Sequence, residues 1–313
     1  MLFKKTIKKV SIIIGIAIIV LWFGGNLGFY IYHKSIFDDE TEKALNKTPE
    51  KLTLSEAKVD AENISIMGFN LKFPFYKEDI ISVIPLFWEE ELDTIVIFLR
   101  NRKKDQNFIV EFKTAPYIPE APLFKKIKSW IVYGAGTSEI YYSRLTDYSW
   151  WNIRHNIRLS TLLHFKLAAL PKYTNYQIFD LKTPYLNGFL KEGKSEYREG
   201  KFSQMVDFQF ILKNKQHFIR FLSNDDETVN KARDIMTTVR PIDNIEESYK
   251  EMEVLYRSKE RSRYPKELLL LSMISLKGAT VDNLEELLKI LEAKNYKQSH
   301  LIEEQIEYLK NKN

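Results

Sequence analysis

The chain has 313 residues, 44% of them hydrophobic, which is enough to bury one or two hydrophobic cores. It has no cysteine, which excludes disulfides, thiolate metal sites and a cysteine nucleophile. The net charge of +5 arises at the start of the chain: without five early lysines the 47 basic residues fall to 42, equal to the 42 acidic ones. This neutral remainder indicates no nucleic-acid-binding surface, which would carry a basic excess. The five are Lys4, Lys5, Lys8, Lys9 and Lys34.

Residues 10–32 form an apolar run with no charged residue and one strongly polar residue, Asn26. A helix of this length would reach about 34 Å, which exceeds a hydrocarbon layer of about 30 Å. A cleaved signal peptide needs small residues at the last position removed and two positions before it. Cuts after residues 24, 25 and 28 place a large or polar residue there: Trp22, Phe23 and Asn26. We therefore predict one transmembrane helix over residues 10–32, kept as a signal anchor, in preference to a cleaved peptide.

The charges on either side of this run predict its orientation. Four lysines precede it within residues 1–9, whereas residues 38–40 beyond it are acidic. The positive-inside rule then predicts a short cytoplasmic tail, with the bulk of the chain outside the cell or in the periplasm. Trp22, Tyr30 and Tyr32 stand toward the outer end, where aromatic rings favour the interface. We expect a single-pass protein of the cell (inner) membrane, and the lysine-rich, cysteine-free composition favours a bacterial envelope.

After the run, residues 33–60 are polar and predict a linker or an exposed helix. The β-branched and aromatic runs at 93–100 and 107–112 predict a hairpin. A second hairpin is predicted where alternating residues 206–212 are followed by a turn at Asn214 and a returning strand.

Two helical patterns accompany these hairpins. Residues 138–170 predict one long helix or two, apolar on most of their circumference and therefore buried. A shorter helix follows the second hairpin, with capping acids at Asp225 and Asp226 and a stop at Pro241, and should pack on the sheet. For residues 61–243 this order predicts an α+β domain with an antiparallel sheet and packed helices.

Residues 244–313 carry only helical patterns, with helix starts near Pro265, Val281 and Ser299. We expect an all-helical C-terminal extension whose apolar stripes dock a protein partner.

Catalytic and cofactor motifs are weak. Gly134 and Gly136 resemble a dinucleotide turn, but Glu139 stands where the third glycine belongs, so a tight turn before a helix cap is the better interpretation. His155 and His164 would lie about 180° apart on one helix and could not share a metal. The acids at 89–91 could supply a general acid, but a charged surface turn explains them better. We predict no catalytic residue, no metal ligand and no cofactor.

The segment at residues 147–158 is the best candidate for binding, because paired indoles beside cationic groups can grip sugars, lipid headgroups or an aromatic partner. On a helix, Trp151, Arg154, His155 and Arg158 would share a face that Trp150 does not. The simpler alternative buries both indoles against the sheet. The candidate binding residues are Tyr148, Trp150, Trp151, Arg154, His155 and Arg158.

Together these patterns favour a membrane-anchored, outward-facing protein that binds or assembles a partner without catalysis. The alternative is an envelope hydrolase acting on cell-wall or lipid substrates through the acids at 89–91 or through His155. A signalling or secretion component with a cytoplasmic contact is disfavoured, since fewer than ten residues would lie inside.

Overall fold

The computed structural model describes residues 24–28, 31–32, 35, 37–88, 91–101, 106–116, 138–169, 176–194, 202–213, 215–258, 262–296 and 299–312. Two compact units make up the chain. We name them the small unit (Met1–Pro49 with Trp130–Thr174) and the sheet unit (Glu50–Ser129 with Asn175–Asn313). The domain boundaries expected from the sequence, at residues 33, 61 and 244, stay predictions.

The predicted membrane anchor lies mostly outside the described residues, as do its flanking residues Lys4, Lys5, Lys8, Lys9, Trp22 and Tyr30. Among the residues that are described, no helix is both long and apolar enough to cross a bilayer.

The small unit is helical. It contains α2 (Asp39–Asn46), α4 (Ser138–Tyr142), the 3-10 helix η1 (Leu145–Asp147) and α5 (Ile153–Ala169). Asp38 caps α2 by accepting a hydrogen bond from the Thr41 amide. The core of the small unit includes Phe37, Leu45, Leu159 and Leu163. The expected burial of this helix holds for one side of α5 only, because the other side is exposed, with Ile157 at 49%.

Lys166 crosses the interior of the small unit, where its side chain is fully buried. Its ammonium donates to the carbonyls of Leu45, Lys47 and Ser143 at 2.7, 2.6 and 2.8 Å. These bonds tie the end of α2 to α5 and to the segment after α4. Burial lowers the pKa of Lys166 to about 8.

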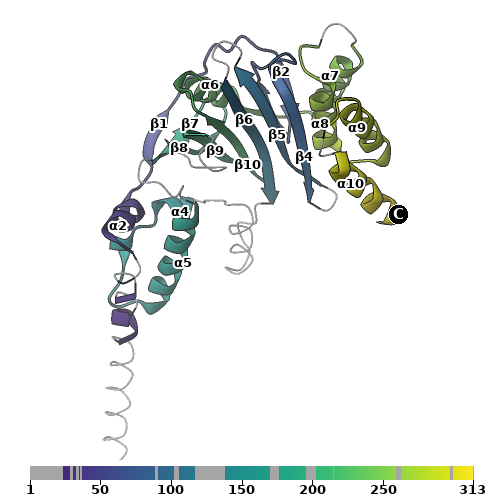
Figure 1. Ribbon diagram of the computed structural model, residues 1–313. Coiled ribbons are helices and arrows are strands. Elements are labelled where there is room, and N and C mark those ends of the chain that lie inside the picture. Colours follow the sequence, from purple (N-terminus) through teal and green to yellow (C-terminus); the bar gives the residue numbers. More distant parts are fainter. Residues whose placement is uncertain are drawn as a thin grey trace, which may run out of the picture. The chain divides into compact units, whose positions relative to one another are not determined.

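The sheet unit is built on one eight-stranded sheet (Figure 1) with the order β1-β7-β8-β9-β10-β6-β5-β4. Its strands are β1 (Glu50–Thr53), β4 (Ile80–Trp88), β5 (Glu91–Asn101), β6 (Gln106–Pro116), β7 (Tyr176–Lys182), β8 (Asn187–Lys194), β9 (Gln204–Leu212) and β10 (Lys215–Ser223). The two predicted hairpins are confirmed as β5–β6 and β9–β10.

The sheet is mixed, because β1 pairs in parallel with β7 while the other pairs are antiparallel. The expected α+β class is therefore right and the purely antiparallel sheet is wrong. β1 was hidden in the predicted linker because its four residues are largely exposed and show no apolar alternation.

A second, three-stranded sheet has the order β11-β3-β2, formed by β2 (Asn63–Ile66), β3 (Phe69–Lys72) and β11 (Arg240–Pro241). The predicted helix after the second hairpin is α6 (Asp226–Thr237), capped by Asp225 and packed on β9 and β10.

The remaining helices are α7 (Ile245–Arg257), α8 (Lys266–Lys277), α9 (Val281–Ala293) and α10 (Ser299–Lys312), and Figure 1 shows them gathered beside β4 and β2. Their starts match the predicted ones at Pro265, Val281 and Ser299. α8 contacts β2, β4 and β5, and its residues 268–271 are at most 2% exposed. The C-terminal helices therefore share one hydrophobic core with the sheet.

Candidate functional site

The predicted binding segment lies in the small unit, and both of its indoles are exposed. Trp150 is 45% and Trp151 71% exposed, so the expectation that both are buried is wrong. α5 begins at Ile153, which leaves the two tryptophans in the preceding loop and removes the predicted helical face shared by Trp151 and Arg154.

Side-chain amides hold this loop in place. Asn152 accepts a hydrogen bond from the His155 amide at 3.0 Å and so caps the start of α5. Asn156, which is 1% exposed, accepts from the Ser149 amide at 2.9 Å and donates to the Ser149 carbonyl at 2.6 Å. The imidazole Nε2 of His155 lies 2.9 Å from the Asp147 carbonyl oxygen.

The structure brings together some of the six predicted residues but not all. Tyr148 and Trp150 meet edge to face with ring centroids 5.3 Å apart. Arg158 instead pairs with Glu139 at 2.8 Å, and Arg154 and His155 are exposed. No cage of the kind that encloses a ligand forms among them.

A junction that sequence reasoning missed joins this loop to residues 24–28. The Asn26 amide donates to the Trp150 carbonyl at 3.0 Å, and its oxygen accepts from Asn156 at 2.7 Å. Asn26 is fully buried as a result. Nearby, Tyr32 stacks on His164, with its hydroxyl 3.5 Å from Nε2. A single polar residue inside an apolar run was the only indication of this junction.

The catalytic candidates are dispersed. Glu89, Glu90, Gly134 and Gly136 lie outside the described residues. Glu91 is exposed and pairs with Lys215 at 2.8 Å. Within the described residues no group of three or more His, Asp or Glu side chains is arranged to hold a metal ion.

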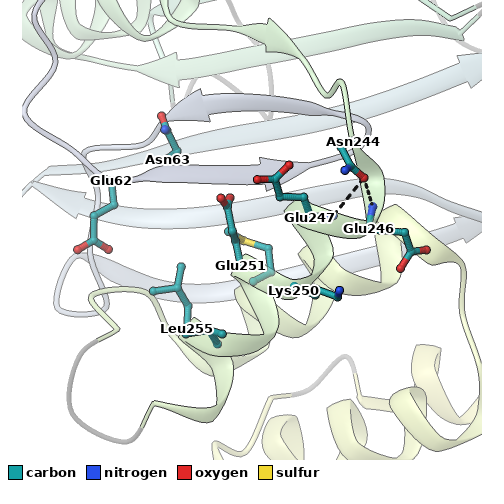
Figure 2. Close-up of a pocket in the computed structure, with 10 residues that line it drawn as sticks. Glu62, Asn63, Asn244, Glu246, Glu247, Lys250, Glu251 and Leu255 are labelled. Atoms are coloured by element: carbon teal, nitrogen blue, oxygen red, sulfur yellow. Dashed lines mark hydrogen bonds between the residues drawn. The ribbon is translucent and has the colours of Figure 1, made fainter.

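A groove of about 640 Å³ runs along α7 in the sheet unit (Figure 2). Its lining combines carboxylates with an apolar floor and includes one ammonium group: Glu62, Asn63, Asn244, Glu246, Glu247, Lys250, Glu251, Met252, Val254 and Leu255. Val254 is 68% exposed, the largest exposed fraction among the Val, Leu and Ile side chains of the described residues.

α7 positions these groups because Asn244 caps its start, accepting hydrogen bonds from the amides of Glu246 and Glu247. Glu247 and Glu251 are four residues apart, and in Figure 2 their carboxylates lie on the side of α7 that faces Asn63. Glu246 pairs with Lys277 at 2.7 Å, and Glu62 lies 3.9 Å from Arg263. Within the described part of the chain, no cation pairs with Glu247 or Glu251. The groove is therefore electronegative beside an apolar surface.

A second cavity of about 390 Å³ lies between the β2–β3 turn, β10 and the end of α8. Its walls include His217 and Thr114, which face each other across β10 and β6, with Glu91 and Lys215 also in the lining. His217 Nδ1 and Thr114 Oγ1 are buried without a hydrogen-bond partner among the described residues. Burial lowers the pKa of His217 to about 4, against a smaller opposing effect of a hydrogen bond to the Leu212 backbone.

No family model, curated protein or solved structure matches this chain.

Proposed function

We propose that the chain is a membrane-anchored accessory protein that binds a basic, partly apolar segment of a partner protein along α7. The observation that carries the proposal is the groove of Figure 2, whose lining combines carboxylates with apolar side chains. The exposed Val254 is one of these apolar side chains.

The chemistry of the groove defines the occupant. Glu247 and Glu251 stand one helical turn apart, so two lysines or arginines at matching spacing could meet both carboxylates. Val254 and Leu255 offer an apolar contact next to these charges. A partner segment that alternates basic and apolar residues would satisfy both features, and charge complementarity would speed its capture.

The membrane part of the proposal is supported by the apolar run at residues 10–32 and by the lysines before it. It assigns residues 1–9 to the cytoplasm and both folded units to the outer or periplasmic side of the cell membrane.

Photocrosslinking from the groove tests the proposal. Because the chain has no cysteine, Val254→Cys provides a unique position for a photoactivatable maleimide on full-length protein in its native membrane. We expect a recurrent protein adduct whose crosslinked peptide is rich in Lys or Arg. The double charge reversal Glu247→Lys/Glu251→Lys should abolish the adduct.

The matched control reverses Glu303 and Glu307, an exposed pair with the same spacing on α10, and should leave the adduct unchanged. The proposal fails if no recurrent adduct forms, if the adduct peptide is acidic, or if both reversals weaken it equally. Point changes are preferable to deleting residues 245–313, because α8 supplies part of the core.

The hydrolase alternative gains little from the geometry. Its best position is the second cavity, where Glu91 and His217 both line the walls. Glu91 is 70% exposed and paired with Lys215, and a histidine with a pKa of about 4 is a weak base near neutral pH. His155, the other candidate, is exposed, and its Nε2 lies at hydrogen-bond distance from the Asp147 carbonyl oxygen.

A further inference from the structure

If the N-terminal run spans a membrane, as proposed above, the hydrogen bonds of Asn26 fix the depth of the small unit relative to the bilayer. The 16 residues from position 10 to position 25 would cover about 24 Å as a helix, which is less than the hydrocarbon thickness of about 30 Å. The run reaches about 34 Å only when residues 26–32 are included. Residues 26–32 would therefore lie at the outer boundary of the hydrocarbon or just inside it.

The groups that touch these residues must lie at the same depth. Asn26 is bonded to the Trp150 carbonyl and to the Asn156 amide. A methyl group added at Gly25 would meet the side chain of Ile153 at 2.7 Å, which shows how closely the start of α5 approaches. The loop before α5 therefore lies at the same depth as the end of the run.

The polar and apolar groups at the junction suit that depth. A polar amide inside a membrane must be satisfied by protein, and Asn26 is fully buried with both ends of its amide bonded. Around it, large apolar side chains are exposed: Leu27 at 47%, Ile31 at 57%, Trp150 at 45%, Trp151 at 71% and Ile157 at 49%. Trp favours the headgroup region, where an indole is both apolar and able to donate a hydrogen bond.

The nearby arginines complement a lipid surface. Arg154 and Arg158 are exposed on the first turns of α5. Arg158 pairs with Glu139 at 2.8 Å, whereas Arg154 forms no ion pair with any acid in the described ranges. Long cationic side chains at this level can extend to lipid phosphates while their stems remain among the acyl chains.

We propose that the exposed apolar side chains around the Asn26 junction, led by Trp151 and Ile157, are embedded in the outer-leaflet interface, so that the small unit is a second membrane contact beside the anchor. The occupant of this surface is the lipid bilayer. The inference rests on the proposed anchor and is independent of the groove on α7.

Nitroxide labels at single introduced cysteines test this in the full-length, cysteine-free protein in nanodiscs of phosphatidylcholine and phosphatidylglycerol. Trp151→Cys and Ile157→Cys report on the proposed surface, Ile16→Cys reports on the anchor, and Val254→Cys is an exposed reference in the sheet unit. Collision with lipid-soluble oxygen is compared with collision with a water-soluble nickel chelate. We expect the labels at 16, 151 and 157 to collide several-fold more with oxygen, relative to nickel, than the label at 254.

Each failure has its own pattern. If the label at 16 contacts lipid but those at 151 and 157 behave like the one at 254, the interface proposal is overturned and the anchor stands. If the label at 16 is accessible to nickel, the anchor itself is refuted and this inference is refuted with it. Two reporters in the surface protect the test against one variant that fails to fold.

Discussion

His217 should make the sheet unit less stable in mild acid. The residue is 2% exposed, stacked on Phe210 at 5.2 Å and placed edge-on to Phe69 at 5.5 Å. Burial in this aromatic setting lowers its pKa from 6.5 to about 4, and the charge on Lys215 acts in the same direction. The folded protein therefore keeps this imidazole neutral at pH values where an unfolded chain would protonate it.

The sign and size of the effect follow from linkage. Between pH 6.5 and pH 4 the unfolded state binds more protons than the folded state, so stability falls as the pH falls through this window. A shift from 6.5 to about 4 contributes a loss of about 2 kcal/mol between pH 7 and pH 5. Below pH 4 both states are protonated and this contribution stops growing.

The variant His217→Phe removes the titrating group while keeping a ring against Phe210. The free energy of unfolding of the full-length protein is measured in urea at pH 7 and at pH 5, with hydrogen exchange of the β9 and β10 amides as the readout. The loss of this free energy between the two pH values should be smaller by about 2 kcal/mol in the variant. His300→Phe, which removes an exposed imidazole on α10, is the control and should retain the full loss. Equal losses in the unchanged chain and in His217→Phe would refute the reasoning.

Three further substitutions test what stabilises each unit. Lys166→Met leaves three carbonyl oxygens without their hydrogen-bond donor, at a cost of about 1–3 kcal/mol each. This cost should appear as lost hydrogen-exchange protection in α2, and unchanged protection would show that the carbonyls find other donors. Burial alone would raise the pKa of Asp207, but Lys191 and Arg220, each 3.1 Å away, hold it below its usual value. Asp207→Asn should cost about 3–5 kcal/mol in urea unfolding, because the Lys191 side chain is only 4% exposed. A Cβ at position 188 would lie 2.3 Å from the Gln209 carbonyl oxygen, so Gly188→Ala should cost about 1–3 kcal/mol and lower the melting temperature.

The hairpins and the C-terminal helices were predictable because their patterns are local. β9 alternates apolar and polar residues, β10 contains the largely apolar run at 217–222, and α7 to α9 have caps or apolar stripes that can be found without knowing the fold. In these elements, burial against the core and sequence period point to the same structure.

The elements that sequence reasoning missed depend on distant partners. β1 is a strand because β7, more than 120 residues later, offers a parallel edge. The groove on α7 needs Glu62, in the segment before β2, to line the same cavity as Glu247 and Glu251, and no local pattern predicts that arrangement. The exposure of Trp151 was equally hidden, since α5 starts two residues after it and not before it.

Asn26 connects the interpretation of the sequence with that of the fold. In the apolar run alone it is an anomaly, a polar residue that weakens both a signal peptide and a spanning helix. In the structure it is a buried connector whose amide is satisfied by Trp150 and Asn156, two residues that lie in sequence far from the run. A polar residue that requires protein partners at that point is expected where a membrane helix leaves the hydrocarbon into a folded unit, and is not needed in a peptide that is cut off. Its hydrogen bonds are those that a retained run would need at this point, and retention itself stays a prediction.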